Sequence, residues 1–365
     1  MILNELKELI NEGVKIGAFP GACFSVITKD GKYMDFVGLK AKYPKEEVNS
    51  IDTIYDMASV TKVATTTTCF LKLLESGKVR LFDRVNLYLP DFKINDIMIY
   101  HLVTHTSGLR ECLPKPTTIK TKEEAIKLLY EQPQEFKEGT DMVYSDLNYI
   151  LLGLIIEKIT GKSLDEYADE VMYKPLEMKD TCFNPKDILR CAPTEERNDD
   201  IVKGIVRGKV HDETAYILGG VAGHAGMFST ISDMSNFLTM LLNDGIYNGK
   251  RFLSHATMEL IFHPLASKPV GLSNLKLNRS VGWIVNDYNS SSGDLTSMET
   301  IDHTGFTGTN VWVDRINEVA FCMLSNRVHP TRQNTKHIAL RAKIANFIMA
   351  HLDTIKEEIK NGDYN

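Results

Sequence analysis

The stretch Asp56-Met-Ala-Ser-Val-Thr-Lys-Val-Ala-Thr-Thr-Thr-Thr-Cys69 places a serine three residues before a lysine. A run of β-favouring residues at 53–55 precedes it, and we expect a helix to begin at Ala58-Ser59. Ser59 then lies in the first helical turn, on the same face as Lys62. The amine can take or relay the hydroxyl proton, and the free N–H groups of the first turn can stabilise nearby negative charge. We therefore predict that Ser59 is a catalytic nucleophile.

The Ser-x-x-Lys spacing also occurs elsewhere, because about one match is expected by chance in a chain of this size. Ser273-Asn-Leu-Lys276 is the second match. It lies in a polar stretch flanked by proline and glycine, so we interpret it as a solvated loop. The prediction for Ser59 consequently depends on the motifs that accompany it.

Composition is typical of a soluble globular protein. The 365 residues are 43% hydrophobic and 25% charged, with a net charge of −6 and no basic block. We therefore expect neither nucleic acid nor an anionic membrane surface as a partner. The N-terminal segment is amphipathic and charged, unlike a signal peptide, and no apolar run reaches membrane-spanning length. These features favour a cytoplasmic location.

The cysteines favour a reducing compartment. They are scattered, mostly among apolar neighbours, and form no Cys-x-x-Cys pair, so we expect buried free thiols without a disulfide framework or a zinc site. The six are Cys23, Cys69, Cys112, Cys182, Cys191 and Cys322.

Strand patterns occur at both ends of the chain. After a helix at 3–16, two β-rich runs at 22–28 and 33–39 flank Asp30-Gly31, a hairpin signal. Near the C-terminus, four more runs precede a long helix predicted at 331–360. These four runs are 281–285, 297–303, 309–314 and 318–325.

The region between these strands is mostly helical and loop. Its predicted helices are 63–76, 97–106, 122–131, 148–159, 163–172 and 232–243, the last two with serine N-caps. The pattern predicts an α/β (α+β) fold with a sheet built from both termini and a helical insert. We expect one unit, 1–365, with a sheet lobe at about 1–58 and 275–365 and a helical lobe at about 59–274, meeting at a cleft.

Two further motifs carry candidate catalytic groups. Tyr144-Ser-Asp146 follows a turn and precedes an apolar helix, so it is well placed to face a cleft. A tyrosine near lysine cations has its phenolate favoured and can act as a general base. His303-Thr-Gly305-Phe306-Thr-Gly308 ends a predicted strand. Its glycines permit close approach of a substrate, and the Phe306 N–H can join that of Ser59 in an oxyanion hole.

Together these motifs resemble the serine β-lactamase and penicillin-binding protein (DD-peptidase) superfamily, specifically its class C-like branch. The resemblance spans most of the chain. It rests on Phe19-Pro20-Gly21-Ala22, Ser59-Val-Thr-Lys62, His101-Leu-Val-Thr-His-Thr-Ser-Gly-Leu109, Tyr144-Ser-Asp146, Gly219-Gly-Val-Ala-Gly-His-Ala-Gly-Met-Phe-Ser-Thr230 and His303-Thr-Gly305. The fold it implies is β-lactamase/transpeptidase-like, with an antiparallel sheet.

The resemblance implies acyl transfer in two steps. Ser59 would attack a carbonyl to form an acyl-enzyme while Lys62 and Tyr144 manage its proton, and water would then release the acid. His303 would take the place of the lysine in many members' Lys-Thr-Gly. Thr304 and Gly305, together with the amides of Ser59 and Phe306, would contact the substrate.

Two residues depart from the family pattern. The imidazole of His303 is neutral or titrating, so a substrate carboxylate would bind less dependably than to a lysine. Asp146 replaces a more usual asparagine and can accept hydrogen bonds but not donate them when ionised. Because an aspartate near Lys62 favours the ammonium form, we hypothesise that Tyr144 is the general base.

Other signals have simpler structural interpretations. His101 and His105 are four residues apart, but no His-Glu-x-x-His motif is present and the family uses no metal, so we expect structural histidines and no metal or cofactor. The glycine-rich 219–226 segment lacks a Gly-Lys-Ser/Thr ending, so it is interpreted as a tight loop beside the cleft, with His224 at the rim. Trp283 and Trp312 are expected in the core.

The predicted function is that of a cytoplasmic serine hydrolase acting on a small ester or amide. Candidate activities are those of an esterase, a D-amino-acid peptidase or carboxypeptidase, a muropeptide amidase or a weak β-lactamase. The alternative is a non-catalytic binder or sensor that holds a ligand or stays acylated. Substrates would be small esters, peptides or muropeptides.

Overall fold

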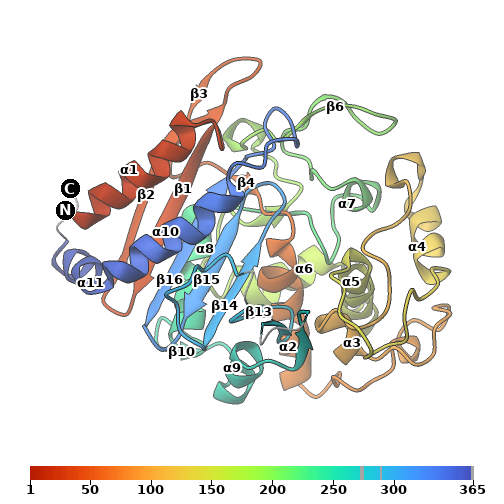
Figure 1. Cartoon of the computed structure of the whole chain (residues 1–365). Helices are drawn as coiled ribbons and strands as arrows, with labels where there is room; N and C mark the ends of the chain where they lie inside the picture. Colours follow the sequence, from red (N-terminus) through yellow and green to blue (C-terminus); the bar gives the residue numbers. More distant parts are fainter. Residues whose placement is uncertain (272–274, 288–289, 363–365) are drawn as a thin grey trace.

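Two strands near the N-terminus lie toward one edge of the largest sheet in the computed structural model, which describes residues 1–271, 275–287 and 290–362 (Figure 1). β1 (Gly21–Thr28) pairs antiparallel with β2 (Lys32–Ala41). The other edge of β1 pairs antiparallel with β16 (Val319–Ser325), a strand about 300 residues later in the chain. The predicted sheet from both termini is therefore confirmed.

This sheet contains nine strands among the described residues, in the order β11-β12-β13-β14-β15-β16-β1-β2-β3, and every neighbouring pair is antiparallel. The remaining members are β3 (Glu47–Val48), β11 (Ala266–Pro269), β12 (Lys276–Arg279), β13 (Ile284–Val285), β14 (Thr300–Thr304) and β15 (Asn310–Asp314). β11 and β12 are not predicted from the sequence, and Ser273 of the second Ser-x-x-Lys lies outside the described residues.

Helices cover both faces of the sheet, so the strands alternate between two cores. On one face, Phe24 and Val26 pack with helices α1 (Ile2–Lys15), α10 (Ile338–Ala350) and α11 (Leu352–Asn361). Figure 1 shows these three helices together at the end of the molecule where the two termini meet. On the other face, α8 (Ile231–Leu242) packs on β1 and β16. Because strand side chains alternate, His303 faces the same side as Ile301, toward the second core.

The residues between the termini build a helical region beside this second face. Its α-helices are α2 (Thr67–Glu75), α3 (Ile99–Val103), α4 (Lys122–Tyr130), α5 (Asp146–Thr160), α6 (Leu164–Ala168), α7 (Glu213–Ile217) and α9 (His255–Phe262). α5 is buried along most of its length. The division into two lobes stays a prediction. Two elements from the range assigned to the helical lobe belong with the nine-stranded sheet: α8 packs on it, and β11 is one of its strands.

Short elements connect the helical region to the sheet. A three-stranded sheet contains β4 (Tyr55–Asp56), β8 (Met227–Ser229) and β5 (Cys182–Phe183). Two hairpins pair β6 (Glu196–Asn198) with β7 (Lys203–Ile205), and β9 (Ile246–Tyr247) with β10 (Lys250–Arg251). The 3₁₀ segments are Val85–Leu87, Pro116–Thr118 and Ile188–Arg190, and the π-helical turns are Lys62–Thr66 and Asp169–Tyr173.

Several predicted boundaries are wrong for identifiable reasons. The segment predicted as one closing helix at 331–360 forms two helices, which are separated at His351. The first of them starts only at Ile338, because the carbonyls of Arg332 and Asn334 accept hydrogen bonds from the Arg327 guanidinium instead of joining a helix. The N-cap of α8 is a threonine, Thr230, rather than a serine.

The interior matches most of the remaining expectations. Trp283 and Trp312 are fully buried, as predicted. All six cysteines are free thiols, but Cys112 is exposed and Cys182 only half-buried, since both lie outside the packed helices. Within the described residues, none of the helices combines the length and the apolar character needed to cross a bilayer.

Candidate active site

Ser59 lies in a tight turn between β4 and the following helix. The preceding residue, Ala58, has a positive φ of 46°, and its N–H donates to Asp56 Oδ1 at 2.9 Å. The amides of Val60 and Lys62 bond three residues back, the latter to the Ser59 carbonyl at 3.0 Å. The helix therefore begins just after Ser59, and the prediction that Ser59 occupies its first turn is wrong by one residue. A left-handed residue here turns the chain sharply before the helix.

The turn between β14 and β15 is fastened against this segment. Thr307 Oγ1 donates to the Asp56 carbonyl at 2.7 Å, and Thr309 Oγ1 donates to the Met57 carbonyl at 3.0 Å. A Cβ atom on Gly305 would lie 2.1 Å from Thr309 Oγ1 and 2.6 Å from the Met57 oxygen, so only glycine fits. These contacts bring the His303-Thr-Gly motif to the nucleophile, as the sequence predicts.

The Lys62 ammonium has three close polar neighbours. Its Nζ lies 2.9 Å from Ser59 Oγ, 2.7 Å from Asp146 Oδ1 and 3.1 Å from the main-chain oxygen of His224. Burial lowers the pKa of Lys62, but Asp146 and Tyr144 raise it more, and the net pKa lies above its ordinary value. An ammonium that donates to Ser59 has no lone pair with which to accept the serine proton.

Tyr144 lies beside this lysine, with its ring centroid 4.8 Å from Lys62 Nζ. The ring also lies 4.7 Å from that of His105 and 6.0 Å from that of His303, and 38% of the residue is exposed. Burial of the hydroxyl raises the pKa of Tyr144, whereas Lys62 acts in the opposite direction and lowers it. The effect of Lys62 on the pKa of Tyr144 therefore has the expected direction, but the effect of burial is larger. The resting tyrosine is protonated near neutral pH.

His105 holds the Tyr144 loop in place. Its Nδ1 accepts hydrogen bonds from the Ser145 N–H at 3.1 Å and from Asn148 at 3.2 Å, and its carbonyl accepts from the Val143 N–H. This structural role is the one expected for the histidines of the His101–Leu109 motif. His101 Nδ1 likewise accepts from the Met98 N–H at 3.1 Å.

His303 is a neutral imidazole in this site. Its Nδ1 lies 2.9 Å from the Thr304 carbonyl, which can only accept, so Nδ1 carries the proton and Nε2 is left as an acceptor. Burial, together with the nearby cations Lys62 and Arg279, lowers the pKa of His303 to about 3. His303 therefore supplies no positive charge at neutral pH.

Buried neutral histidines predict that acid destabilises the fold. Burial, with Arg341 and Arg327 nearby, lowers the pKa of His337 to about 3, and an unfolded histidine titrates near 6.5. Between pH 6.5 and 3 the unfolded chain therefore binds more protons, and the free energy of unfolding falls as pH drops. We expect His337→Gln to flatten this slope by about 1.4 kcal/mol per pH unit in urea unfolding at pH 6, 5.5 and 5.

The wild type, unfolded in urea at the same three pH values, is the reference for this slope. An unchanged slope in His337→Gln would contradict a buried neutral imidazole at that position.

The amides of Ser59 and Phe306 are free to bind an oxyanion, since neither donates a hydrogen bond to another described residue. The Phe306 side chain is half exposed, stacks on His211 at 5.7 Å and lies under the Arg327 guanidinium at 4.3 Å. Arg327 Nε also donates to the Phe306 carbonyl at 2.7 Å, which fixes the peptide unit next to the free amide.

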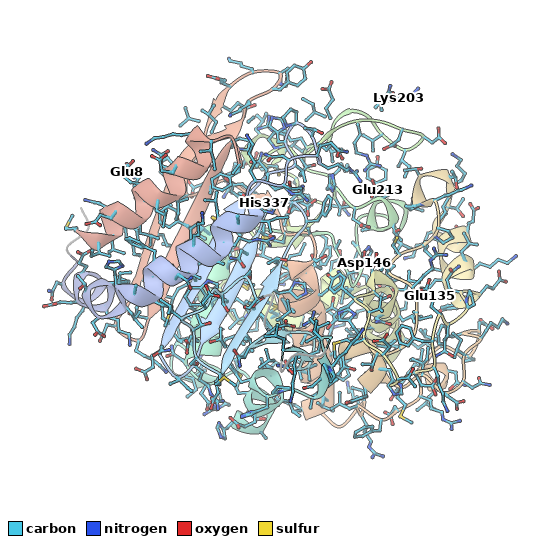
Figure 2. The ribbon with its side chains drawn as sticks, in the orientation of Figure 1. Glu8, Glu135, Asp146, Lys203, Glu213 and His337 are labelled. Atoms are coloured by element: carbon cyan, nitrogen blue, oxygen red, sulfur yellow. The ribbon has the colours of Figure 1, made fainter. Side chains whose placement is uncertain are left out.

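A cavity of about 500 Å³ opens in front of Ser59, within the usual range for small-molecule sites. Tyr144, His303, Thr304, Gly305 and Phe306 line it, so the structure brings these predicted residues together. Its remaining lining is largely cationic and is not identified by the sequence motifs: Arg279, Arg327, Arg332 and Arg341, with His337 and Ile338. Figure 2 labels His337 just before α10 and Asp146 at the start of α5.

Asp212 and His224 form a second layer behind Lys62. His224 Nε2 lies 2.7 Å from Asp212 Oδ1, and its side chain is 1% exposed, so the prediction that it lines the rim is wrong. His224 instead contributes its carbonyl to Lys62. Asp212, Asp146 and His224 place ligand-type atoms within 4.8 Å of one another, but Asp146 already pairs with the Lys62 ammonium, whose charge opposes a metal ion.

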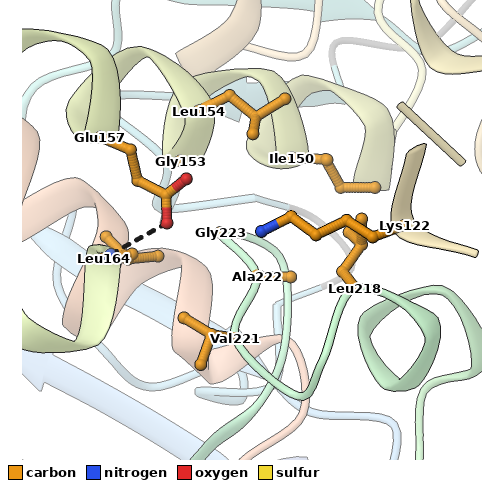
Figure 3. A pocket seen from close by; sticks show the side chains of 10 residues that line it. All are labelled: Lys122, Ile150, Gly153, Leu154, Glu157, Leu164, Leu218, Val221, Ala222 and Gly223. Atoms are coloured by element: carbon orange, nitrogen blue, oxygen red, sulfur yellow. Dashed lines mark hydrogen bonds between the residues drawn. The ribbon is translucent and has the colours of Figure 1, made fainter. Parts of the chain in front are cut away.

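The glycine-rich 219–226 segment packs tightly against α5. A Cβ on Gly223 would lie 2.0 Å from the Tyr149 carbonyl, so the loop and helix touch through their backbones. The adjoining cavity, lined by Gly153, Glu157 and Lys122 among others, has room for about 20 Å³ (Figure 3). It is too small for a substrate, and the tight-loop prediction agrees with this packing.

Comparisons with known proteins agree with this geometry. A family model described as Beta-lactamase matches residues 6–346. The chain is 30% identical, over 90% of its length and 81% of the relative's, to N-acetylmuramyl-L-alanine amidase of Bacillus subtilis (strain 168). It is 31% identical, over 90% and 82%, to the putative D-alanyl-D-alanine carboxypeptidase of Escherichia coli (strain K12).

Solved structures share the fold. One described as a class C beta-lactamase superposes with a TM-score of 0.74 at 21% identity, covering 96% of this chain and 96% of that one.

Proposed function

Because the chain belongs to the beta-lactamase family of serine hydrolases, we propose that it hydrolyses a small ester or amide through an acyl-enzyme on Ser59. The observation that carries the proposal is the environment of one hydroxyl. Ser59 Oγ accepts a hydrogen bond from the Lys62 ammonium. Ser59 and Phe306 line the same cavity, and the amide of neither residue donates to another described residue.

In the proposed acylation step, the reacting species is the small fraction of molecules in which Tyr144 is a phenolate. Ser59 Oγ attacks the substrate carbonyl carbon and its proton passes to the Tyr144 phenolate oxygen. The carbonyl oxygen becomes an oxyanion held by the amides of Ser59 and Phe306, an interaction typically worth about 3 kcal/mol per donor. Tyr144 then gives the proton to the departing alkoxide or amine as the bond to the leaving group breaks. Lys62 remains an ammonium throughout and stabilises negative charge on Ser59 and Tyr144.

Deacylation repeats these steps with water as the nucleophile. Tyr144 takes a proton from water as it attacks the acyl carbon, and Ser59 leaves with a proton returned by Tyr144. Asp146 keeps Lys62 charged and in place through its 2.7 Å ion pair. Its carboxylate, 24% exposed, offers a hydrogen-bond acceptor to a substrate N–H or O–H.

For the substrate, we propose an amide or ester from cell-wall muropeptides. The relatives named as an amidase of N-acetylmuramyl-L-alanine and as a putative D-alanyl-D-alanine carboxypeptidase support this class. Because His303 is neutral, a substrate carboxylate would bind weakly beside this residue in β14. This argues against efficient hydrolysis of penicillins.

The test is the release of p-nitrophenol from short acyl esters, followed from the first turnover. An initial burst equal to the enzyme concentration, followed by sustained turnover, supports the proposal. A burst without turnover would favour the sensor alternative, in which the acyl-enzyme persists. The absence of any burst or turnover, with esters and with N-acetylmuramyl-L-alanine, would contradict the proposed function.

A further inference from the structure

The four arginines of the cavity differ in how their charges are balanced. Arg332 Nε and Nη2 pair with Glu195 at 2.6 Å and Glu213 at 2.7 Å. Arg279 pairs with Asp287 at 3.1 Å. Arg327 and Arg341 pair with no carboxylate among the described residues, so two cations of the cavity lack a counter-ion there.

Arg327 is a buried cation with one open end. It is 5% exposed, and its Nε and Nη1 donate to the main-chain oxygens of Phe306, Arg332 and Asn334 at 2.7–2.8 Å. Its Nη2 donates to no described residue. Burial and the neighbouring cations Arg341 and Arg332 lower the pKa of Arg327 to about 10. Burying a guanidinium without a counter-ion is costly, so the fold retains this charge at an expense in stability.

Arg341 approaches the same cavity from α10. It is half-buried and makes no hydrogen bond or ion pair with a described residue. The carboxyl group that influences the pKa of Arg341 is that of Asp302. The Asp302 side chain points to the opposite side of β14 from His303 and accepts hydrogen bonds from Ser290 and Ser291. The guanidinium of Arg341 is therefore available to a ligand.

We propose that the cavity recognises substrates carrying a separate anionic group, a carboxylate or a phosphate, which binds Arg327 Nη2 and the Arg341 guanidinium. This inference rests on the proposed function and specifies its substrate. Guanidinium groups bind both oxyanions through paired N–H donors, with hydrogen bonds about twice as strong as neutral ones. Arg341 lies on α10 and Arg327 lies in the loop before it. The anion would therefore bind away from His303, the position at which many members of the family carry a lysine.

A second consequence links binding to chemistry. Arg327 contacts the bound anion through Nη2 and the Phe306 carbonyl through Nε, and the Phe306 amide faces the proposed oxyanion. Occupation of the arginine pair would hold the oxyanion donor in place. The anion is therefore expected to raise kcat as well as to lower KM.

The test compares two esters with five-carbon acyl chains, p-nitrophenyl pentanoate and mono-p-nitrophenyl glutarate, which ends in a carboxylate. The wild type should favour the glutarate by about ten- to a hundredfold in kcat/KM. Arg341→Met should lower kcat/KM for the glutarate far more than for the pentanoate and so abolish that preference, and Arg341→Lys should retain part of it. Arg84→Met, a surface change of the same charge at a side chain that is 58% exposed, should keep the full preference.

Inorganic phosphate and acetate, tested as competitive inhibitors of pentanoate hydrolysis, distinguish the two sources of the anion. Stronger inhibition by phosphate indicates a phosphorylated substrate, and stronger inhibition by acetate a carboxylate. Equal loss of both ester activities in Arg341→Met, or no ester preference and no inhibition in the wild type, would overturn the proposal.

If neither ester is hydrolysed, the proposed function fails separately. Anion binding is then read from the melting temperature, which phosphate or glutarate should raise in the wild type but not in Arg341→Met. An equal melting temperature with and without these anions in the wild type would overturn the anion site on its own.

Discussion

Ser59→Ala is expected to lower kcat/KM for p-nitrophenyl esters by at least about 10⁴-fold, because no other group can form the acyl-enzyme. The variant should fold normally, since the hydroxyl is a hydrogen-bond acceptor of Lys62 and not a core group. Intact mass after incubation with a fluorophosphonate should show one adduct in the wild type and none in Ser59→Ala. The same readout identifies the nucleophile whatever the natural substrate.

The control for this variant is the other Ser-x-x-Lys of the chain. Ser273→Ala should keep full activity and the full adduct, because no partner motif accompanies that serine. A residual adduct in Ser59→Ala would place the nucleophile elsewhere and contradict the site described above.

Tyr144→Phe is expected to reduce kcat by about 10²- to 10⁴-fold, the range typical of a lost general acid–base. Because burial raises the pKa of Tyr144, only a small fraction is deprotonated at neutral pH. The wild-type rate should therefore rise with pH between 7 and 9, with a slope of log kcat near one, and this rise should disappear in Tyr144→Phe. Steady-state kinetics across this pH range make the measurement.

Tyr167→Phe provides the matched control, since Tyr167-Ala-Asp169 has the same spacing but lies in α6. It should keep both the rate and the pH profile. Lys62→Met should also lose activity, because it removes the donor that holds Ser59 Oγ. Near-normal turnover in Tyr144→Phe combined with inactivity of Lys62→Met would make Lys62 the base and the assignment of Tyr144 wrong.

The fold is largely predictable from sequence because its signals are local. The nearly continuous apolar, β-favouring runs of β1 and β16 and the Asp30-Gly31 turn identify the sheet, and the family match confirms the resemblance that the motifs indicate. The start of the closing segment is less predictable, because helical periodicity continues through a loop in which two carbonyls accept hydrogen bonds from a single arginine, Arg327.

The site is predictable only where its residues belong to motifs. Ser59, Lys62, Tyr144 and His303 stand in recognisable patterns, and the structure gathers them around one cavity. The arginines have no such pattern. Arg327 and Arg341 are separated by a loop and a helix start, and nothing local distinguishes them from arginines that pair with carboxylates on the surface. Only the folded structure shows that Arg327 and Arg341 line the same cavity as Ser59.

The pairing of β1 with β16 has a consequence for synthesis of the protein on the ribosome. At about 5–20 residues per second, β1 waits roughly 15–60 seconds before its partner emerges, about 300 residues later. During that interval a largely apolar strand has one edge without hydrogen-bond partners. The chain therefore completes its central sheet only after translation is nearly finished, and the nascent N-terminal hairpin is the segment that a ribosome-associated chaperone would need to shield.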